Sequence, residues 1–237
     1  MYTFYKQNPL GFALSWIGIY VVSLSAADAL SQSLGIEKLV TAALSLAMTA
    51  FLYLWVKQHA LLQTYGLAQM NAKQPWLHYW PLMLLISTNL WGGVQLHNSV
   101  PETVLYMLSM LCVGFLEELI FRGFLFRAIC RDNVRIAIFV SSITFGVGHI
   151  VNLLNGADLL PTLLQIIYAT AAGLLFTVMV YRWESLWPCI ITHSILNALS
   201  AVAGPRSQAM DYVSAAFLTI VALAYAAWIW KSTEKEA

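Results

Sequence analysis

The chain consists largely of long, continuous apolar segments that are separated by short polar ones. Most are close to the roughly 20 residues that a helix needs to cross the hydrocarbon core of a bilayer. Apolar and polar residues do not alternate within them, which favours helices over the strands of a membrane β-barrel. We therefore predict an all-α polytopic membrane protein, a single domain over residues 1–237 formed by a bundle of about eight transmembrane helices. The segments are 10–29, 39–56, 80–94, 104–126, 135–154, 160–181, 186–203 and 212–230.

The scarcity of charge supports this prediction. Charged residues make up 10% of the chain, whereas soluble domains carry roughly 25%, so the chain has too few charges to cover a water-facing surface. The net charge of +1 gives no basic face of the kind that nucleic-acid binding needs. A soluble enzyme, a disordered protein and a nucleic-acid binder are therefore disfavoured. We expect the protein to be surrounded by membrane lipid.

Lysine and arginine fall mainly on one side of the predicted topology. With the N-terminus in the cytoplasm and eight alternating spans, only Lys38 and Arg206 of the 12 basic residues lie on the outer side. Loops rich in Lys and Arg remain in the cytoplasm, so we predict cytoplasmic N- and C-termini. The other ten are Lys6, Lys57, Lys73, Arg122, Arg127, Arg131, Arg135, Arg182, Lys231 and Lys235.

Two adjacent glutamates, Glu117 and Glu118, lie inside the apolar segment 104–126. A carboxylate in hydrocarbon costs about 2.5–3.5 kcal/mol on insertion scales, so two in succession need a reason. Glu118 and Arg122 are four residues apart and share a helix face, which allows them to pair. Glu117 points about 100° away from Glu118, so it is free for another task. The alternative is that both glutamates belong to one structural ion-pair network.

Two histidines also lie inside apolar segments. His149 follows Phe145 by four residues in segment 135–154, where Gly146 and Gly148 permit close backbone approach. His193 and Asn197, also four residues apart, share one helix face. A single intramembrane histidine is more often packed and hydrogen-bonded than catalytic. Two histidines, two glutamates, an arginine and an asparagine on three helices favour one shared site.

The depth of these residues is compatible with one site in the cytoplasmic half of the membrane. At 1.5 Å per residue, Glu117 lies about 12 Å and His193 about 10 Å from the cytoplasmic edge. His149 lies about 20 Å from that edge, a difference that tilt or a glycine kink can absorb. We expect an integral multi-pass protein of the plasma membrane of a bacterium or archaeon, with its active site in the cytoplasmic half.

Three motifs resemble those of the CPBP family, the CAAX-protease and bacteriocin-processing intramembrane endopeptidases. Residues 117–122 are similar to its EExxxR motif, residues 145–149 to FxxxH and residues 193–197 to HxxxN. Their order and spacing fit, and the resemblance covers about residues 111–199. It implies an eight-helix intramembrane protease that hydrolyses peptide bonds near the membrane surface. It also implies a peptide or protein substrate that, in some relatives, is lipidated.

Hydrolysis of a peptide bond requires a base that activates water and donors that hold the oxyanion. We assign Glu117 as the general base and His149 as the group that shares the water and protonates the leaving amine. His193 and Asn197 are expected to donate to the oxyanion. Glu118, held by Arg122, is expected to fix the geometry of Glu117, with Phe145 as a supporting residue.

The cofactor prediction is that none is needed. Zinc is the alternative, with Glu117, His149 and His193 as its ligands. No HExxH motif is present, and these ligands would come from three separate helices, each needing a supporting partner. We therefore favour a glutamic-type hydrolase over a metalloprotease.

Two other functions remain open on the sequence alone. A non-catalytic membrane scaffold or bacteriocin-immunity factor would share the fold but bind a partner instead of cutting it. A transporter or proton relay would also bury Glu and His, but such proteins often contain inverted repeats, and we find no repeat. The sequence does not distinguish a prenylated CAAX tail from a leader peptide or a transmembrane segment as the substrate, nor does it fix the oligomeric state.

Overall fold

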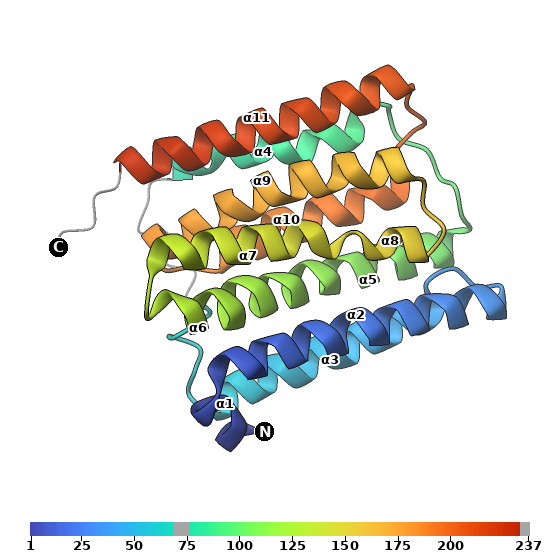
Figure 1. Ribbon diagram of the computed structural model, residues 1–237. Helices are drawn as coiled ribbons and strands as arrows, with labels where there is room; N and C mark the ends of the chain where they lie inside the picture. Colours follow the sequence, from blue (N-terminus) through green and yellow to red (C-terminus); the bar gives the residue numbers. More distant parts are fainter. Residues whose placement is uncertain (69–75, 233–237) are drawn as a thin grey trace.

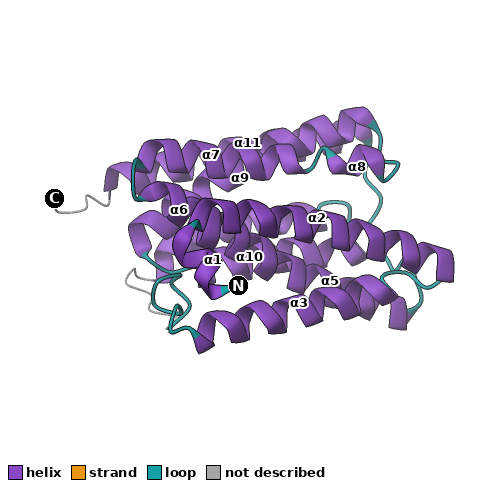
Figure 2. Cartoon of the chain, turned by 60° about the horizontal axis from the view of Figure 1, so that its bottom comes forward, coloured by secondary structure: helices purple, strands orange, loops and turns teal. Residues whose placement is uncertain are grey.

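The computed structural model describes residues 1–68 and 76–232, and these form a bundle of helices (Figures 1 and 2). Within that part of the chain there is no β-strand, only an isolated bridge between Val94 and Ala203. The all-α prediction is therefore confirmed. The elements are α1 (Tyr2–Gln7), α2 (Pro9–Leu34), α3 (Leu39–Gln58), η1 (Trp76–Tyr79), α4 (Trp80–Ser87), η2 (Thr88–Leu90), α5 (Val100–Glu117), η3 (Glu118–Leu125), α6 (Phe126–Cys130), α7 (Val134–Gly148), α8 (Val151–Leu154), α9 (Leu159–Trp183), α10 (Trp187–Leu199), η4 (Ser200–Val202) and α11 (Gln208–Ser232).

Six of the predicted segments are helices that are long and apolar enough to cross a membrane. The third and seventh segments are also helical, but they are shorter, at Trp80–Leu90 and Trp187–Val202. The third ends early because Gly92 and Gly93 follow it and Gly93 has φ +81°, a conformation that suits glycine and breaks a helix. A multi-pass membrane protein is thus confirmed, while a count of eight spans stays a prediction.

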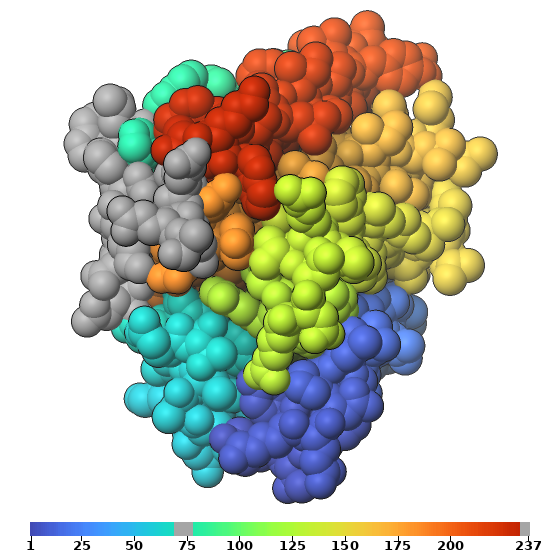
Figure 3. Space-filling view, turned by 60° about the vertical axis from the view of Figure 1, so that its left-hand side comes forward, coloured from blue at the N-terminus to red at the C-terminus, as the bar shows by residue number. Residues whose placement is uncertain are grey.

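The helices run back and forth between two ends of the bundle (Figure 1). The chain starts at the end on the left of Figure 1, and α11 finishes at that same end. We call this the terminal end; α1 meets α2, and α6 meets α7, there (Figure 1), and Figure 3 shows the molecule with this side turned forward. The opposite end carries the connections α2–α3, α8–α9 and α10–α11. Eight alternating segments would place both ends of the chain on the same side, and both ends of the described chain do lie on one side.

The basic residues follow this division, with one correction. Lys57, at the end of α3, and Arg182, at the end of α9, lie at the terminal end, whereas Lys38 lies in the α2–α3 connection. Arg122 does not belong to that polar end, because its side chain is fully buried inside the bundle. Lys73 and Lys235 lie outside the described residues. The cytoplasmic location of the terminal end stays a prediction.

The longest span is one continuous helix, Val100–Cys130, that contains a π-helical stretch. It begins with a capping box, in which the Ser99 side chain accepts from the Glu102 backbone and the Glu102 carboxylate accepts from the Ser99 N–H. From Glu118 to Leu125 the helix widens to the i→i+5 pattern. All eight residues of this stretch are buried. It lies at the centre of the bundle and contacts α2, α6, α7 and α9.

Two glycines allow pairs of neighbouring helices to pack closely against each other. A Cβ on Gly114 would lie 2.6 Å from the backbone N and 2.7 Å from the Cα of Ser194, so α10 packs directly on the α5 backbone. A Cβ on Gly146 would lie 2.8 Å from the Ile166 carbonyl, which brings α7 against α9. The prediction of close approach is thus confirmed at Gly146. It is wrong at Gly148, where no atom lies within 4 Å of an added Cβ.

We expect Gly114→Ala to lower the free energy of unfolding by about 1–3 kcal/mol, the usual cost of overpacking. The added methyl group has no room because the obstructing atoms belong to the α10 backbone. The matched control is Gly18→Ala in α2, where an added Cβ meets nothing within 4 Å; it should be neutral or gain up to about 1 kcal/mol in helix propensity. Thermal unfolding in detergent compares the two, and equal stability of both variants would contradict the close packing of α5 on α10.

Candidate active site

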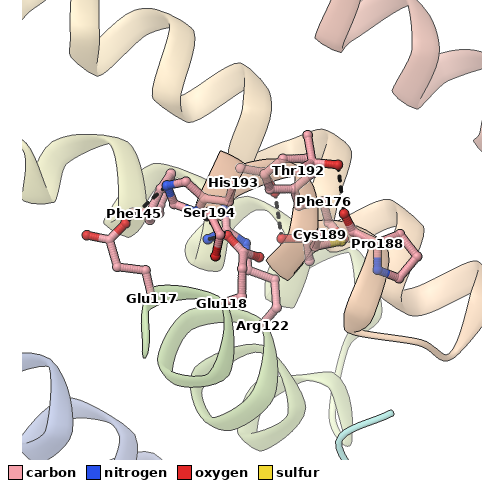
Figure 4. A network of polar contacts seen from close by, with 12 residues as sticks. Glu117, Glu118, Arg122, Phe145, Phe176, Pro188, Cys189, Thr192, His193 and Ser194 are labelled. Atoms are coloured by element: carbon pink, nitrogen blue, oxygen red, sulfur yellow. Dashed lines mark hydrogen bonds and ion pairs between the residues drawn. The ribbon is translucent and has the colours of Figure 1, made fainter. Parts of the chain in front are cut away.

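Residues from all three predicted motifs lie close together inside the bundle, and Figure 4 shows Glu117, Phe145 and His193 among them. Glu117 ends α5 and Glu118 begins the π-helical stretch, while Phe145 lies in the last turn of α7 and His149 caps that helix. His193 lies in the middle of α10. The close approach at Gly114 carries α10, and with it His193, onto the glutamate pair.

Glu118 is a fully buried carboxylate that is held by two donors. Its Oε1 atom accepts from Arg122 Nη1 at 3.1 Å and from His193 Nδ1 at 2.7 Å. Both Glu118 and Arg122 are 0% exposed. The Arg122 guanidinium also stacks 4.0 Å from the Phe145 ring centroid, a cation–π contact that disperses its charge. The predicted Glu118–Arg122 pair is therefore present, and both of its members are fully buried.

Glu117 points away from this pair (Figure 4). Its side chain is 14% exposed. The Oε1 atom accepts a hydrogen bond of 2.6 Å from the Tyr20 hydroxyl on α2, and the Oε2 atom lies 3.4 Å from His193 Nε2. The two adjacent glutamates thus have different surroundings. Glu118 is buried and paired with Arg122, whereas Glu117 is partly exposed.

His193 connects the two carboxylates through its two ring nitrogens. A carboxylate only accepts, so Nδ1 carries the proton that it donates to Glu118. Nε2 then faces Glu117, where it accepts a proton from that residue or, on a doubly protonated ring, donates one. The position predicted for His193 beside the glutamates is present. The two ring nitrogens face Glu117 and Glu118. The sequence gave no indication of these contacts and predicted only that His193 donates to the oxyanion.

His149 reaches the same space from α7 without a contact to either glutamate. Its Nδ1 atom donates to the Phe145 carbonyl at 3.1 Å, since a carbonyl oxygen only accepts. In the neutral ring this leaves the Nε2 lone pair free to bind water or accept a proton. Asn197, one turn after His193 on α10, lines the same space. The structure brings both residues to the site, as the motifs predict.

A cavity of about 520 Å³ contains these groups. Glu117, His149, His193 and Asn197 all line it, whereas Glu118 and Arg122 do not. Such a volume is typical of sites that bind small molecules or short segments. The four residues that we assign to chemistry therefore line the cavity, whereas the buried pair lies outside it and contacts one of them, His193, through Glu118.

The Phe145 ring contacts residues of all three motifs. Besides Arg122, it packs edge-on against His149 at 5.2 Å and against His193 at 5.6 Å between ring centroids. Gly173 on α9 leaves room for the arginine, because a Cβ there would lie 3.1 Å from Arg122 Nη2. Phe145 thus fixes the relative positions of both histidines and the arginine, which supports its predicted role.

The zinc alternative does not fit the observed donors. Across residues 1–68 and 76–232, no three His, Cys, Asp or Glu side chains are grouped closely enough to hold a metal ion. His193 has both ring nitrogens directed at carboxylates, and the Nδ1 atom of His149 bonds to a backbone carbonyl. The expectation that the chemistry needs no cofactor stays a prediction.

Tyr20 is the residue of this site that sequence reasoning missed. It lies on α2, 97 positions from the carboxylate that it binds. A single tyrosine in an apolar segment does not indicate a functional role, because the sequence does not show whether its ring only packs or its hydroxyl also donates a hydrogen bond. Its position at the level of Glu117 in the packed bundle is the only indication of its role.

The comparisons with known proteins agree with the motifs. Residues 99–199 match the family model described as type II CAAX prenyl endopeptidase Rce1-like. The matched part extends from the N-cap of α5 to the end of α10 and contains all three motifs. The searches of curated proteins and of solved structures found no match. The resemblance that was inferred from the three motifs is confirmed over these residues.

Proposed function

We propose that this multi-pass membrane protein, whose residues 99–199 match the Rce1-like protease family model, is an intramembrane endopeptidase with Glu117 as its general base. Its substrate is a membrane-associated peptide or protein. The observation that carries the assignment is the difference between the two glutamates. Glu118 is buried and paired with Arg122, whereas Glu117 faces the cavity that also contains His149, His193 and Asn197.

The residues supply each part of a hydrolysis step. A water bound between Glu117 and the free Nε2 of His149 loses a proton to Glu117, and its oxygen attacks the scissile carbonyl carbon. The Asn197 amide and a doubly protonated His193 donate to the oxyanion that forms. When the C–N bond breaks, the leaving amine takes the proton that Glu117 received from the water, either directly or by way of His149 Nε2, and the free carboxyl group of the product remains. The charge of Glu118 stabilises the positive His193 ring during this step.

Tyr20 acts as a positioning residue, because its hydroxyl holds one oxygen of Glu117 and leaves the other toward His193. Hydrogen bonds to charged groups contribute about 1.5–3 kcal/mol, so we expect Tyr20→Phe to lower kcat about tenfold or more with little change in KM. Tyr53→Phe on α3 is the matched control, since Tyr53 does not line the cavity. A purely structural role for Tyr20 would instead lower the melting temperature of the variant and leave the kcat of its folded fraction unchanged.

The function is tested by comparing peptide termini in membranes that contain the wild-type protein with those that contain Glu117→Gln at equal abundance. We expect new N- and C-termini in membrane-associated substrates only with the wild type. Identical termini in both samples, together with retained capture of a membrane partner, would support the scaffold function instead. Proton or solute flux in reconstituted vesicles, without cleavage, would support the transporter.

A further inference from the structure

A second cavity, of about 270 Å³, lies at the terminal end of the bundle. Its lining comes from α1, the start of α2, the segment that follows α3, the end of η3, and α6 with the residue after it. These elements gather at that end (Figure 1). The cavity shares no lining residue with the one that contains Glu117. Pockets for drug-sized ligands measure about 300–1,000 Å³, so this one suits a smaller group.

Two arginines on one face of α6 line this cavity, which we call the basic pocket. Arg127 and Arg131 are four residues apart, and Arg131, which caps the helix, keeps helical φ and ψ angles of −63° and −35°. Like charges at this spacing repel each other. No aspartate or glutamate is among the described residues that line the pocket, and the neighbouring Asp132 is not part of the lining. A bound anion would therefore offset the repulsion.

The Arg127 side chain also contains a buried donor that has no acceptor. No atom of residues 1–68 and 76–232 accepts a hydrogen bond from its Nε atom. Arg122 and Arg182 contain such an atom too, but each donates to a protein acceptor from another nitrogen. An unpaired buried donor is costly, most of all on a charged group. An acceptor from outside the chain would satisfy this one.

Two tyrosine hydroxyls from other elements add donors to the pocket. Tyr65, in the segment after α3, donates to the hydroxyl of Tyr5 on α1 at 2.9 Å. Burial raises the pKa of Tyr65 well above its usual value, and the nearby charges of Arg131 and Arg127 oppose this only in part. The Tyr65 hydroxyl is therefore protonated at neutral pH. Because Tyr65 donates, the Tyr5 hydroxyl keeps its own proton for another acceptor.

The basic pocket lies where three candidate membrane spans have their ends, which is the level of lipid headgroups. These spans are Pro9–Ser33, Leu39–Gln58 and Val100–Cys130, and both Pro9 and Cys130 line the pocket. The headgroup region begins directly outside the hydrocarbon core. Basic pockets between transmembrane helices bind phosphorylated headgroups, and a guanidinium binds two phosphate oxygens through parallel hydrogen bonds.

We propose that the basic pocket binds a phosphate group with a net negative charge, and that an anionic phospholipid supplies it. Arg127 and Arg131 bind the phosphate oxygens, and the Tyr5 hydroxyl donates to one of them. The bound headgroup connects α1 and the segment after α3 to the end of the long central helix. Because such a ligand binds the folded protein, it raises the melting temperature in proportion to its occupancy.

The test titrates the full-length protein in neutral detergent with phosphatidylglycerol and derives an apparent Kd from the rise in melting temperature. We expect Arg127→Gln with Arg131→Gln to weaken binding about tenfold or more, the effect of losing one hydrogen bond to a charged group. The matched control is Lys57→Gln with Arg135→Gln, which removes two exposed charges outside the pocket. At about 0.5 M salt the Debye length is roughly 4 Å, so the control should bind as the wild type does.

Two further ligands identify the source of the phosphate. Phosphatidylcholine has a trimethylammonium group and no net charge, so it should bind more weakly than phosphatidylglycerol. Inorganic phosphate that stabilises the wild type but not the arginine variant would assign recognition to the phosphate group alone. A response to phosphatidylglycerol only would assign it to the whole lipid.

Two results would overturn the proposal: equal binding of phosphatidylglycerol by the arginine variant and the wild type, or an equal loss of binding in the control variant. Arg131→Gln alone, at an exposed position, provides the same comparison if the double variant does not fold. The measurement needs no hydrolysis, so it does not depend on the proposed protease function.

Discussion

Replacing Glu117 by Gln is expected to lower kcat by about 10²–10⁴-fold, the contribution that a positioned general base makes. Glutamine keeps the size of the side chain and an acceptor for the Tyr20 hydroxyl, but it cannot take a proton from water. The fold should persist, because Glu117 has no buried cationic partner of the kind that Glu118 has in Arg122. Initial rates on a membrane-anchored peptide, together with melting temperatures, measure both effects.

Glu37→Gln is the control for this substitution. This variant has the same change from acid to amide, but Glu37 does not line the cavity. The kcat of Glu37→Gln should therefore equal that of the wild type. Full activity of folded Glu117→Gln would remove Glu117 as the base. Residual activity that disappears on a further His149→Ala change would instead assign the main role to His149.

Replacing Arg122 by Met is expected to have the largest effect on stability, a loss of about 3–5 kcal/mol in the free energy of unfolding. The substitution leaves the charge of Glu118 buried at 0% exposure with only His193 as a partner. It also removes the guanidinium from the Phe145 ring. Chemical unfolding in detergent measures the loss.

The double variant Glu118→Gln with Arg122→Met separates charge from packing. Glutamine still accepts from His193 Nδ1, and no unpaired charge remains, so the double variant should be more stable than Arg122→Met alone. A double variant that is as unstable as the sum of the two single changes would mean that the pair contributes through shape alone.

The hydrophobic segments and the motif spacings predicted most of the fold and site. Continuous apolar runs identify helices, because only helices and closed barrels satisfy the backbone in lipid and the strands of a barrel alternate apolar and polar residues. A spacing of four residues placed Arg122 beside Glu118 and Asn197 beside His193, since both pairs share a helix face. The assignment of separate roles to Glu117 and Glu118 depended on this same geometry, and their different surroundings agree with it.

The parts that could not be predicted depend on packing between distant segments. The partner of Glu117 on α2 is fixed by how that helix lies against the centre of the bundle. The lining of the cavity includes Phe121 and Phe176, which look like ordinary core residues in the sequence. The burial of Arg122 was also missed, because a basic residue near the end of an apolar run looks like a loop charge until the helix is seen to continue to Cys130.

The π-helical stretch makes the site sensitive to chain length. A π turn holds one more residue between its bonded groups than an α turn does, and each residue of an α-helix turns the chain by about 100°. Removing one residue between Glu118 and Arg122 would allow the segment to relax to an α-helix and would change the direction of the arginine relative to the glutamate, which it would then follow by three residues instead of four. The hydrogen bond from Arg122 Nη1 to Glu118 Oε1 would lose its present geometry, although every motif residue would still be present. At this position the number of residues is as much a part of the active site as their identity.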